Sequence, residues 1–171
     1  MERVVLAIGS NKGNRYQNII KGIKQLEKYV KIKKISPFYK NPPIGAKGGN
    51  FLNGAVEIET DLLPYELLKL LKNIEKKIGR KFPHKKNDAR EIDFDIIFYG
   101  NKIIKTKNLK IPHQKFRKRE FVLKPLCEII PDYIDLETNK NIKEIYEEFK
   151  NENIEKNKGY KKRDWENKER R

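Results

Sequence analysis

The chain has 171 residues, and charged and hydrophobic side chains each make up 37% of it. Forty Lys and Arg against 24 Asp and Glu give a formal net charge of +16. This length suits one domain, and no apolar run approaches the roughly 20 residues of a membrane-spanning helix. A single cysteine, Cys127, excludes an internal disulfide and is typical of a cytoplasmic protein. The basic charge leaves two classes open, a nucleic-acid binder and an enzyme for a small anion.

The positive charge is unevenly placed along the chain. Residues 150–171 contain nine Lys and Arg and five Asp and Glu, but only three large apolar side chains. Such a segment cannot bury enough surface to offset the entropy lost on ordering. We therefore expect a domain over residues 1–149, followed by a basic tail over 150–171 that is a frayed helix or disordered.

Hydrophobic periodicity divides the domain into strands and helices. Apolar residues alternate or form short runs where a strand is expected, and recur every three or four residues where a helix is expected. Pro and Gly mark the loops. In chain order, the sequence predicts a strand at 4–8, a helix at 19–30 capped by Asn14, a strand at 30–39, a loop at 42–49, a strand at 51–59, a helix from Pro64 to Gly79, a loop at 80–91, a strand at 92–99, a minor hairpin at 101–109, and helices at 121–130 and 142–149.

The order of the core elements is β-α-β-β-α-β, which is the ferredoxin-like plan of the α+β class. It predicts an antiparallel-dominated sheet with two helices on one face, extended at the C-terminal end by a hairpin and helices. RNA-binding modules and enzymes both use this plan, so the fold alone leaves the function open.

Two aspartates on the fourth core strand are the most informative residues. Asp93 and Asp95 fall on one face of the strand, because side chains alternate. Two carboxylates this close repel unless a cation lies between them, and Mg²⁺ prefers such oxygen ligands together with substrate phosphates. The alternative is a pair of exposed acids on an edge strand. The opposite face is predicted to be apolar, with Ile92, Phe94, Ile96 and Phe98.

Basic and aromatic residues surround this pair in the sequence. Arg90 lies three residues before Asp93, and arginine can clamp phosphate oxygens with two hydrogen bonds. His113 precedes several basic residues and could contact phosphate, although a lone histidine is more often structural. Phe51 and Asn53 share a strand face, where a ring and an amide would suit a planar heterocycle.

Several blocks in unbroken order resemble the 6-hydroxymethyl-7,8-dihydropterin pyrophosphokinase family, over about residues 3–135. The resemblance implies transfer of pyrophosphate from ATP to the pterin hydroxymethyl group, with release of AMP, in folate biosynthesis. The blocks are Gly9-Ser10-Asn11-Lys12-Gly13-Asn14-Arg15, Ser36-Pro37-Phe38-Tyr39, Pro42-Pro43-Ile44-Gly45, Asn50-Phe51-Leu52-Asn53-Gly54-Ala55, Arg90-Glu91-Ile92-Asp93-Phe94-Asp95-Ile96-Ile97, Ile111-Pro112-His113 with Arg119, and Phe121-Val122-Leu123-Lys124-Pro125-Leu126.

The same resemblance implies the roles of individual residues. Asp93 and Asp95 would hold two Mg²⁺ ions that bridge the ATP phosphates, and Phe51 and Phe121 would enclose the pterin. The residues expected along the phosphate path are Arg80, Lys86, Arg90, His113 and Arg119. The residues expected to bind or order the pterin and ATP are Asn41, Pro42, Ile44, Phe51, Asn53, Glu75, Ile96 and Phe121. We expect a monomer whose partners are these two substrates, without membrane or nucleic acid.

The chain departs from the family pattern at Asn41, where Thr or Glu is usual, and in one loop. Asn87-Asp88-Ala89 stands where Trp-Gly-Pro is common, and Phe82 stands where Arg is frequent. An inactive homologue is therefore one alternative. An RNA-binding module is the other, but RNA-recognition strands present two or three exposed aromatic residues, and the third core strand offers only Phe51.

Overall fold

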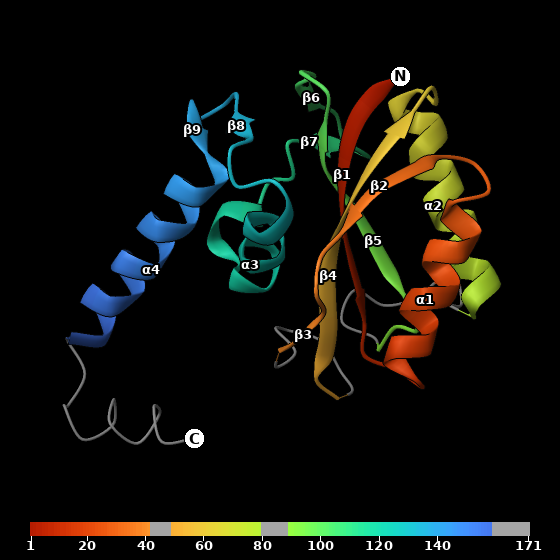
Figure 1. Ribbon diagram of the computed structural model, residues 1–171, viewed down its shortest axis with the longest axis horizontal. Helices are drawn as coiled ribbons and strands as arrows, with labels where there is room; N and C mark the ends of the chain where they lie inside the picture. Colours follow the sequence, from red (N-terminus) through yellow and green to blue (C-terminus); the bar gives the residue numbers. More distant parts are fainter. Residues whose placement is uncertain (42–48, 80–88, 159–171) are drawn as a thin grey trace.

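The computed structural model describes residues 1–41, 49–79 and 89–158. Its main sheet is antiparallel, with strand order β2-β4-β1-β5 and with β3 paired to β4 (Figure 1). The strands of this sheet are β1 (Glu2–Ser10), β2 (Lys31–Ile35), β3 (Tyr39–Asn41), β4 (Phe51–Thr60) and β5 (Asp93–Tyr99). This is the predicted ferredoxin-like order of the α+β class.

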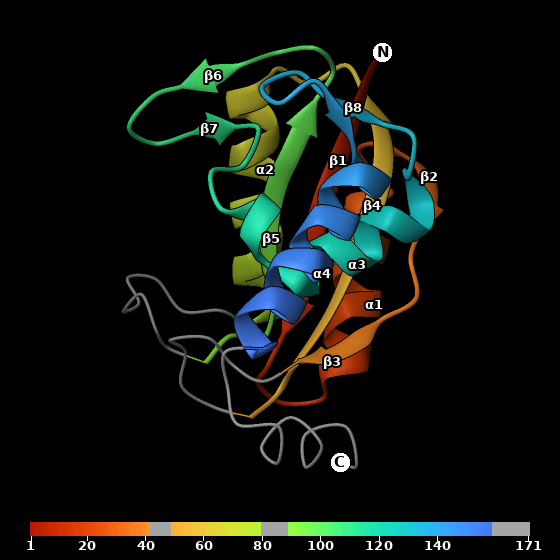
Figure 2. The same ribbon diagram turned by 90° about the vertical axis from the view of Figure 1, so that its left-hand side faces the viewer.

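Helices cover both faces of the sheet: two lie on one face, as the element order predicts, and the C-terminal helices lie on the other face, which the element order left unassigned. Helices α1 (Arg15–Leu26) and α2 (Pro64–Ile78) pack on one face. Helix α3 (Glu120–Ile129) lies on the other face over β4, and α4 (Ile142–Lys158) packs outside α3 (Figures 1 and 2). The smaller elements are β6 (Ile104–Lys105), β7 (Lys110–Ile111), the 3₁₀ helix η1 (Phe116–Lys118), β8 (Ile134–Asp135) and β9 (Lys140–Asn141).

Helix α2 begins and ends where the sequence predicts, whereas α1 follows the predicted cap directly and ends at Leu26, four residues before the predicted end. The Asn14 side chain caps α1 by accepting a hydrogen bond from the N–H of Gln17 at 3.1 Å. Pro64 occupies the first turn of α2, where its missing N–H costs nothing. Gly79 ends α2 with φ of 121°, a conformation that favours glycine.

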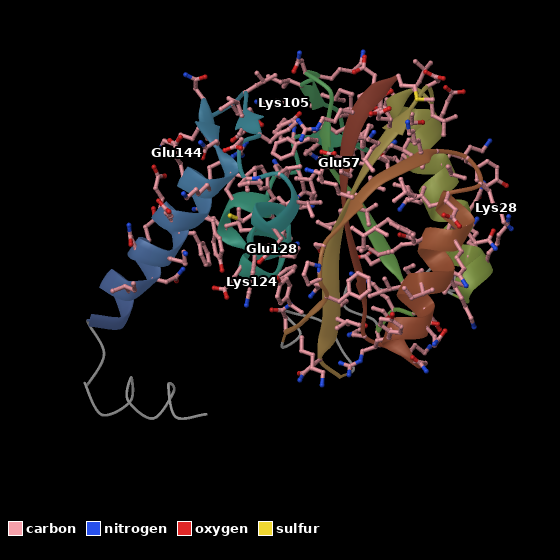
Figure 3. All side chains as sticks on the ribbon, viewed as in Figure 1. Lys28, Glu57, Lys105, Lys124, Glu128 and Glu144 are labelled. Carbon is pink, nitrogen blue, oxygen red and sulfur yellow. The ribbon has the colours of Figure 1, made fainter. Side chains whose placement is uncertain are left out.

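The sheet separates two hydrophobic cores, and side chains fill both interlayer spaces (Figure 3). Val4, Leu6 and Ile8 of β1 face α1 and α2, whereas Val5 faces α3 and α4. Because the central strand is buried on both faces, its sequence forms a continuous apolar run. None of the helices in the described residues combines the length and apolar character needed to cross a bilayer.

A bulge in β5 changes one predicted side-chain direction. Relative to β1, Ile97 is an extra residue between Ile96 and Phe98. Phe98 therefore packs on the α3 side, with its ring centroid 5.1 Å from that of Phe116. The prediction that Phe98 shares a face with Phe94 is wrong, because one extra residue reverses the alternation that follows it.

Other element ends also differ from the sequence pattern. The strand expected over 30–39 is interrupted after residue 35, where Ser36 Oγ accepts a hydrogen bond from the N–H of Ala55 at 2.8 Å. The second strand of the minor hairpin is residues 110–111. The last helix continues to Lys158 instead of ending at Phe149. The order of residues 159–171 lies outside the described part of the chain, so the expected tail and domain boundary stay predictions.

Candidate active site

Asp93 and Asp95 project from β5 on the face of the sheet that carries α3. In the antiparallel register, Asp93 lies opposite Gly9 and Asp95 lies opposite Ala7 of the central strand. Directly opposed residues share a face. Both aspartates are partly exposed, and Ala7 is only partly buried although it lies in the middle of the sheet. The two carboxylates therefore stand beside small residues, with room for a ligand above the sheet.

Like charges surround Asp95. Burial, followed by the charges of Asp93 and Glu75, raises the pKa of Asp95 to about 7, against the opposing effects of Arg119 and Arg90. Arg90 also forms an ion pair with Asp93, with 3.2 Å between Nη1 and Oδ2. Burial and the neighbouring carboxylates disfavour the ionised form of Asp95, and a bound cation would offset both effects.

Glu75 fixes the start of β5 from helix α2. It is buried, and its Oε2 accepts a hydrogen bond from the N–H of Phe94 at 2.8 Å. This N–H points away from β1, along the outer edge of the sheet. Backbone direction repeats every second residue, so the backbone groups of Ile96 face the same outer edge. Glu75 therefore orders the strand, and the side chain of Ile96 lies in the core.

A cavity of about 340 Å³ lies along this outer edge. Residues 94–96 of β5, Leu68 of α2 and residues 107–110 and 113–115 form its walls together with further basic side chains. An elongated anion with a planar end would find both charge and a free strand edge there. The basic residues of the lining are Lys72, Lys107, Lys110, Lys115 and Arg119.

His113 lies at this cavity in its neutral form. Burial, followed by the charges of Arg119 and Lys115, lowers its pKa to about 4, although Asp93 acts in the opposite direction. Its Nδ1 accepts a hydrogen bond from the N–H of Lys115 at 3.1 Å. The ring proton is therefore on Nε2, where it can donate to a phosphate oxygen.

The residues expected on the pterin side lie on β3, β4 and α3. Asn41 pairs with Phe51, and Asn53 pairs with Gly9. A Cβ at Gly9 would lie 2.5 Å from Asn53 Oδ1, so a glycine is needed beside this amide. Phe121, in the first turn of α3, is partly buried against the same face of the sheet.

The register places the pterin side and the acidic side in one row. Asn53, Gly9 and Asp93 are neighbours on β4, β1 and β5. Adjacent strands are about 4.8 Å apart, so the backbones of Asn53 and Asp93 are separated by about 10 Å. Arg119, at the start of α3, has its guanidinium carbon 5.5 Å from the ring centroid of Phe121, and its charge reaches the acidic pair.

Four of the predicted site residues lie outside the described part of the chain, and their roles stay predictions. These are Pro42, Ile44, Arg80 and Lys86.

The opening motif makes contacts to which the sequence assigned no role. The N–H of Asn11 donates to the carbonyl of Arg90 at 3.0 Å, and the N–H of Arg90 donates to Asn11 Oδ1 at 2.7 Å. Arg15 donates from Nη1 to the carbonyl of Asn50 at 2.6 Å. The motif thus holds the backbone just before both halves of the site. The signal that could have revealed this is a polar run directly after a buried strand.

The donor set fits Mg²⁺ bound together with a phosphate ligand. Mg²⁺ commonly takes one or two carboxylates and completes its coordination with phosphates and water. Asp93 and Asp95 provide two such carboxylates. The raised pKa of Asp95 means that its ionised form is disfavoured, and a bound cation would stabilise that form. Within the described residues, no group of three or more His, Cys, Asp or Glu could hold a metal. A closed protein cage for zinc is therefore not formed by these residues.

An acidic pair, a basic cavity and a separate aromatic and amide side are typical of an enzyme that transfers a phosphoryl-type group between two substrates. The model of the 7,8-dihydro-6-hydroxymethylpterin-pyrophosphokinase (HPPK) family matches residues 5–131. The chain belongs to this family.

Curated relatives agree with this assignment. A 2-amino-4-hydroxy-6-hydroxymethyldihydropteridine pyrophosphokinase of Aquifex aeolicus is 44% identical over 154 residues, which is 90% of this chain and 93% of that protein. The protein of the same name from Synechocystis is 34% identical over 146 residues, or 84% and 74% of the two chains. The folic acid synthesis protein FOL1 of Dictyostelium discoideum is 44% identical over 132 residues, which cover 77% of this chain and 20% of that protein.

Solved structures show the same fold. The HPPK-DHPS protein of Plasmodium falciparum superposes with a TM-score of 0.71 at 19% identity, over 87% of this chain and 44% of that chain. This chain therefore spans less than half of the length of that chain.

Proposed function

We propose that the row from Asn53 to Asp93 and the adjoining cavity form the active site of a folate-pathway pyrophosphokinase. The reaction transfers pyrophosphate from ATP to the hydroxymethyl oxygen of 6-hydroxymethyl-7,8-dihydropterin and releases AMP. The observation that supports the proposal is the register, which sets Asn53 and Asp93 two strands apart on one face, so that an amide and a carboxylate flank Gly9. Family membership and the relatives' names support the activity.

The reaction exchanges one phosphorus–oxygen bond for another. The hydroxymethyl oxygen bonds to the β-phosphorus of ATP, and the bond from this phosphorus to the oxygen shared with the α-phosphate breaks. AMP leaves with that oxygen, and the hydroxyl proton passes to water. The protein has little covalent work to do, so positioning and charge neutralisation supply most of the catalysis.

The acidic pair is the proposed metal site. Asp93 and Asp95 would hold two Mg²⁺, which would neutralise charge on the triphosphate. Arg90 keeps Asp93 oriented through their ion pair and can turn part of its guanidinium toward phosphate.

The basic side of the cavity is the proposed phosphate path. Arg119 supplies a fixed positive charge beside the acidic pair, and neutral His113 supplies a hydrogen bond from Nε2. The free backbone edge at Ile96 can pair with the rim of a purine, in the way that a strand edge pairs with a neighbouring strand. This assignment places the base at β5 and the phosphates between β5 and α3.

The opposite side of the row is the proposed pterin site. Phe51 of β4 and Phe121 of α3 would enclose the ring, and Asn53 would donate to and accept from its polar edge. Asn41, opposite Phe51, would close the end of this site. Gly9 forms the floor, because any larger residue would displace the Asn53 amide.

A direct assay tests the activity and separates it from the alternatives. The protein is incubated with ATP, Mg²⁺ and the hydroxymethyl dihydropterin, and AMP is followed by chromatography. AMP formation should require the pterin and should fall at least about a hundredfold in Asp95→Ala, because the metal–phosphate geometry is lost. The matched control is Asp61→Asn, an exposed acid that pairs with the N-terminal amine at 3.5 Å.

Absence of AMP at every magnesium concentration, from a folded protein, would identify an inactive homologue and refute the proposal. Salt-sensitive RNA binding without AMP would favour the nucleic-acid alternative. The monomeric state and the cytoplasmic location stay predictions of the sequence. Some relatives in this family carry mitochondrial names, so location differs within it.

A further inference from the structure

One continuous segment forms a wall of the proposed nucleotide cavity. This wall segment, residues 105–119, contributes His113, Arg119 and several of the lysines that line the cavity. It has little regular structure, because the β6–β7 hairpin pairs only two residues on each side and η1 is one short turn. In its middle, the N–H of His113 donates to the carbonyl of Ile97 at 3.0 Å. Its two ends need other supports.

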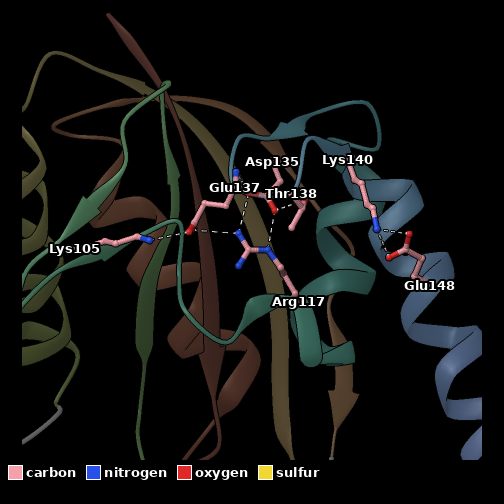
Figure 4. A network of polar contacts seen from close by, with 7 residues as sticks. All are labelled: Lys105, Arg117, Asp135, Glu137, Thr138, Lys140 and Glu148. Carbon is pink, nitrogen blue, oxygen red and sulfur yellow. Dashed lines mark hydrogen bonds and ion pairs between the residues drawn. The ribbon is translucent and has the colours of Figure 1, made fainter.

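The C-terminal end of the wall segment is fixed by a buried ion pair. Arg117 donates from Nε and Nη2 to the two carboxylate oxygens of Asp135, at 2.7 and 2.9 Å (Figure 4). Asp135 is 0% exposed, and it also accepts from Thr138 Oγ1 at 2.7 Å and from the N–H of Glu137 at 3.2 Å. A two-point contact fixes the guanidinium in both position and angle. The Arg117 side chain is therefore held in a single position and orientation.

The charge state of this pair agrees with its geometry. Although burial alone would raise it, the hydrogen bonds from Arg117 and Thr138 lower the pKa of Asp135. The Asp135 hydrogen bond raises the pKa of Arg117. The guanidinium also lies over the Phe116 ring, 4.6 Å from its centroid, and Phe116 is buried against Phe98 of β5. The 3₁₀ turn is thus held between the sheet and the β8–β9 turn.

The other end of the wall segment is tied to the same turn. Lys105 Nζ lies 3.2 Å from Glu137 Oε2, and Arg117 Nη2 lies 3.4 Å from Glu137 Oε1 (Figure 4). Glu137 therefore bridges both ends of the wall segment. The Lys105 side chain is 70% exposed, so this outer contact contributes much less than the buried one.

We infer that Asp135 and Arg117 are positioning residues for the pyrophosphokinase reaction, because they hold the wall segment where His113 and Arg119 face the acidic pair. The inference rests on the proposed function. Arg119 follows Arg117 by two residues at the start of α3, so a shift of the 3₁₀ turn moves the Arg119 guanidinium directly. Displacements near 1 Å are enough to reduce phosphoryl-transfer rates by roughly a hundredfold.

Two variants and a matched control test this inference. Asp135→Asn keeps the shape and removes the charge, and Arg117→Lys keeps the charge and removes the two-point contact. The second variant is needed because loss of one buried charge can prevent folding. The control is Lys140→Met, which removes an ion pair with Glu148 at 2.7 Å in the same part of the molecule (Figure 4). That pair joins β9 to α4, and its two partners both lie outside the wall segment.

Three measurements separate positioning from stability. Circular dichroism gives the folded fraction, kcat is expressed per folded molecule, and calorimetry gives the affinity for a non-hydrolysable ATP analogue. For Asp135→Asn and Arg117→Lys we expect kcat to fall roughly tenfold to a hundredfold. Affinity for the analogue should change much less, because the loss is realised in the transition state. Lys140→Met should retain the kcat of the unmodified chain.

Hydrogen exchange gives a readout that does not depend on activity. The amide hydrogens of residues 107–119 should exchange faster in both variants. In Lys140→Met their exchange rates should be the same as in the unmodified chain. Wild-type kcat per folded molecule in both variants would overturn the inference, and so would equal losses in the control. If the unmodified chain makes no AMP, the proposed function and the positioning role both fail. Faster exchange in the two variants would then show only that the Arg117–Asp135 contact holds the wall segment in place.

Discussion

The raised pKa of Asp95 leads to a quantitative prediction about metal binding. A metal ligand must be deprotonated, so binding competes with the proton on this carboxyl. With a pKa of about 7, Asp95 is ionised in about one molecule in eleven at pH 6 and in nine of ten at pH 8. The apparent affinity for a divalent ion should therefore rise about tenfold between these two pH values. An ordinary carboxyl, with a pKa near 3.8, would give no change over the same interval.

The assay uses Mn²⁺ as a probe, without nucleotide, so that no phosphate titrates in the same range. Free Mn²⁺ is followed by electron paramagnetic resonance at pH values from 6 to 8. The control variant is again Asp61→Asn, which should keep the slope, while Asp95→Asn should lose most of the binding. An affinity that is constant from pH 6 to pH 8 would refute the charge assignment, and so would an equal slope in Asp95→Asn.

The same shift predicts the sign of a stability change in the metal-free protein. Between pH 3.8 and about 7 the native state keeps a proton on Asp95 that the unfolded chain has released. The contribution of this group to the free energy of unfolding should therefore decrease as the pH rises through that interval. Urea denaturation of the unmodified chain and of Asp95→Asn, over a range of pH, measures the difference.

Three further substitutions test the floor of the site and its opening motif. Gly9→Ala should raise the pterin KM roughly tenfold, because the new Cβ would lie 2.5 Å from Asn53 Oδ1; an unchanged KM would place the pterin elsewhere. Asn11→Ala should lower kcat roughly tenfold, because it releases the backbone of Arg90. Asn14→Ala removes a helix cap, so it should lower the free energy of unfolding by about 1 kcal/mol and leave kcat per folded molecule unchanged. Equal kinetic losses in the two asparagine variants would contradict this difference.

The strand pattern was sufficient to predict the fold and the shared face of the acidic pair. Asp93 and Asp95 alternate with apolar residues, so their direction follows from the two-residue period. The pattern fails after Ile96, because four apolar residues in succession contain no alternation from which a bulge could be recognised. The direction of Phe98 therefore depended on packing against Phe116, which is distant in sequence.

The covering of the second face could not be read from local patterns. Helices were expected near residues 121–130 and 142–149, but periodicity does not say which face of a sheet a helix will cover. Contacts between distant segments carry that information, such as the hydrogen bond from Tyr39 Oη to Glu128 at 3.1 Å, with Lys124 above the Tyr39 ring. The Arg117–Asp135 pair is of the same kind, because a single Arg and a single Asp in a chain rich in both give no signal by themselves.

The two outer strands of the sheet also bear on self-association. An exposed strand edge can pair with another copy of the chain, and charged side chains oppose such pairing. At β2 this protection comes from lysines, among them Lys33, which is paired with Glu59. At β5 the aspartates and the wall segment limit access to the edge. Occupation of that edge by a nucleotide would complete the protection, so the proposed nucleotide site would also protect the sheet against pairing with a second copy of the chain.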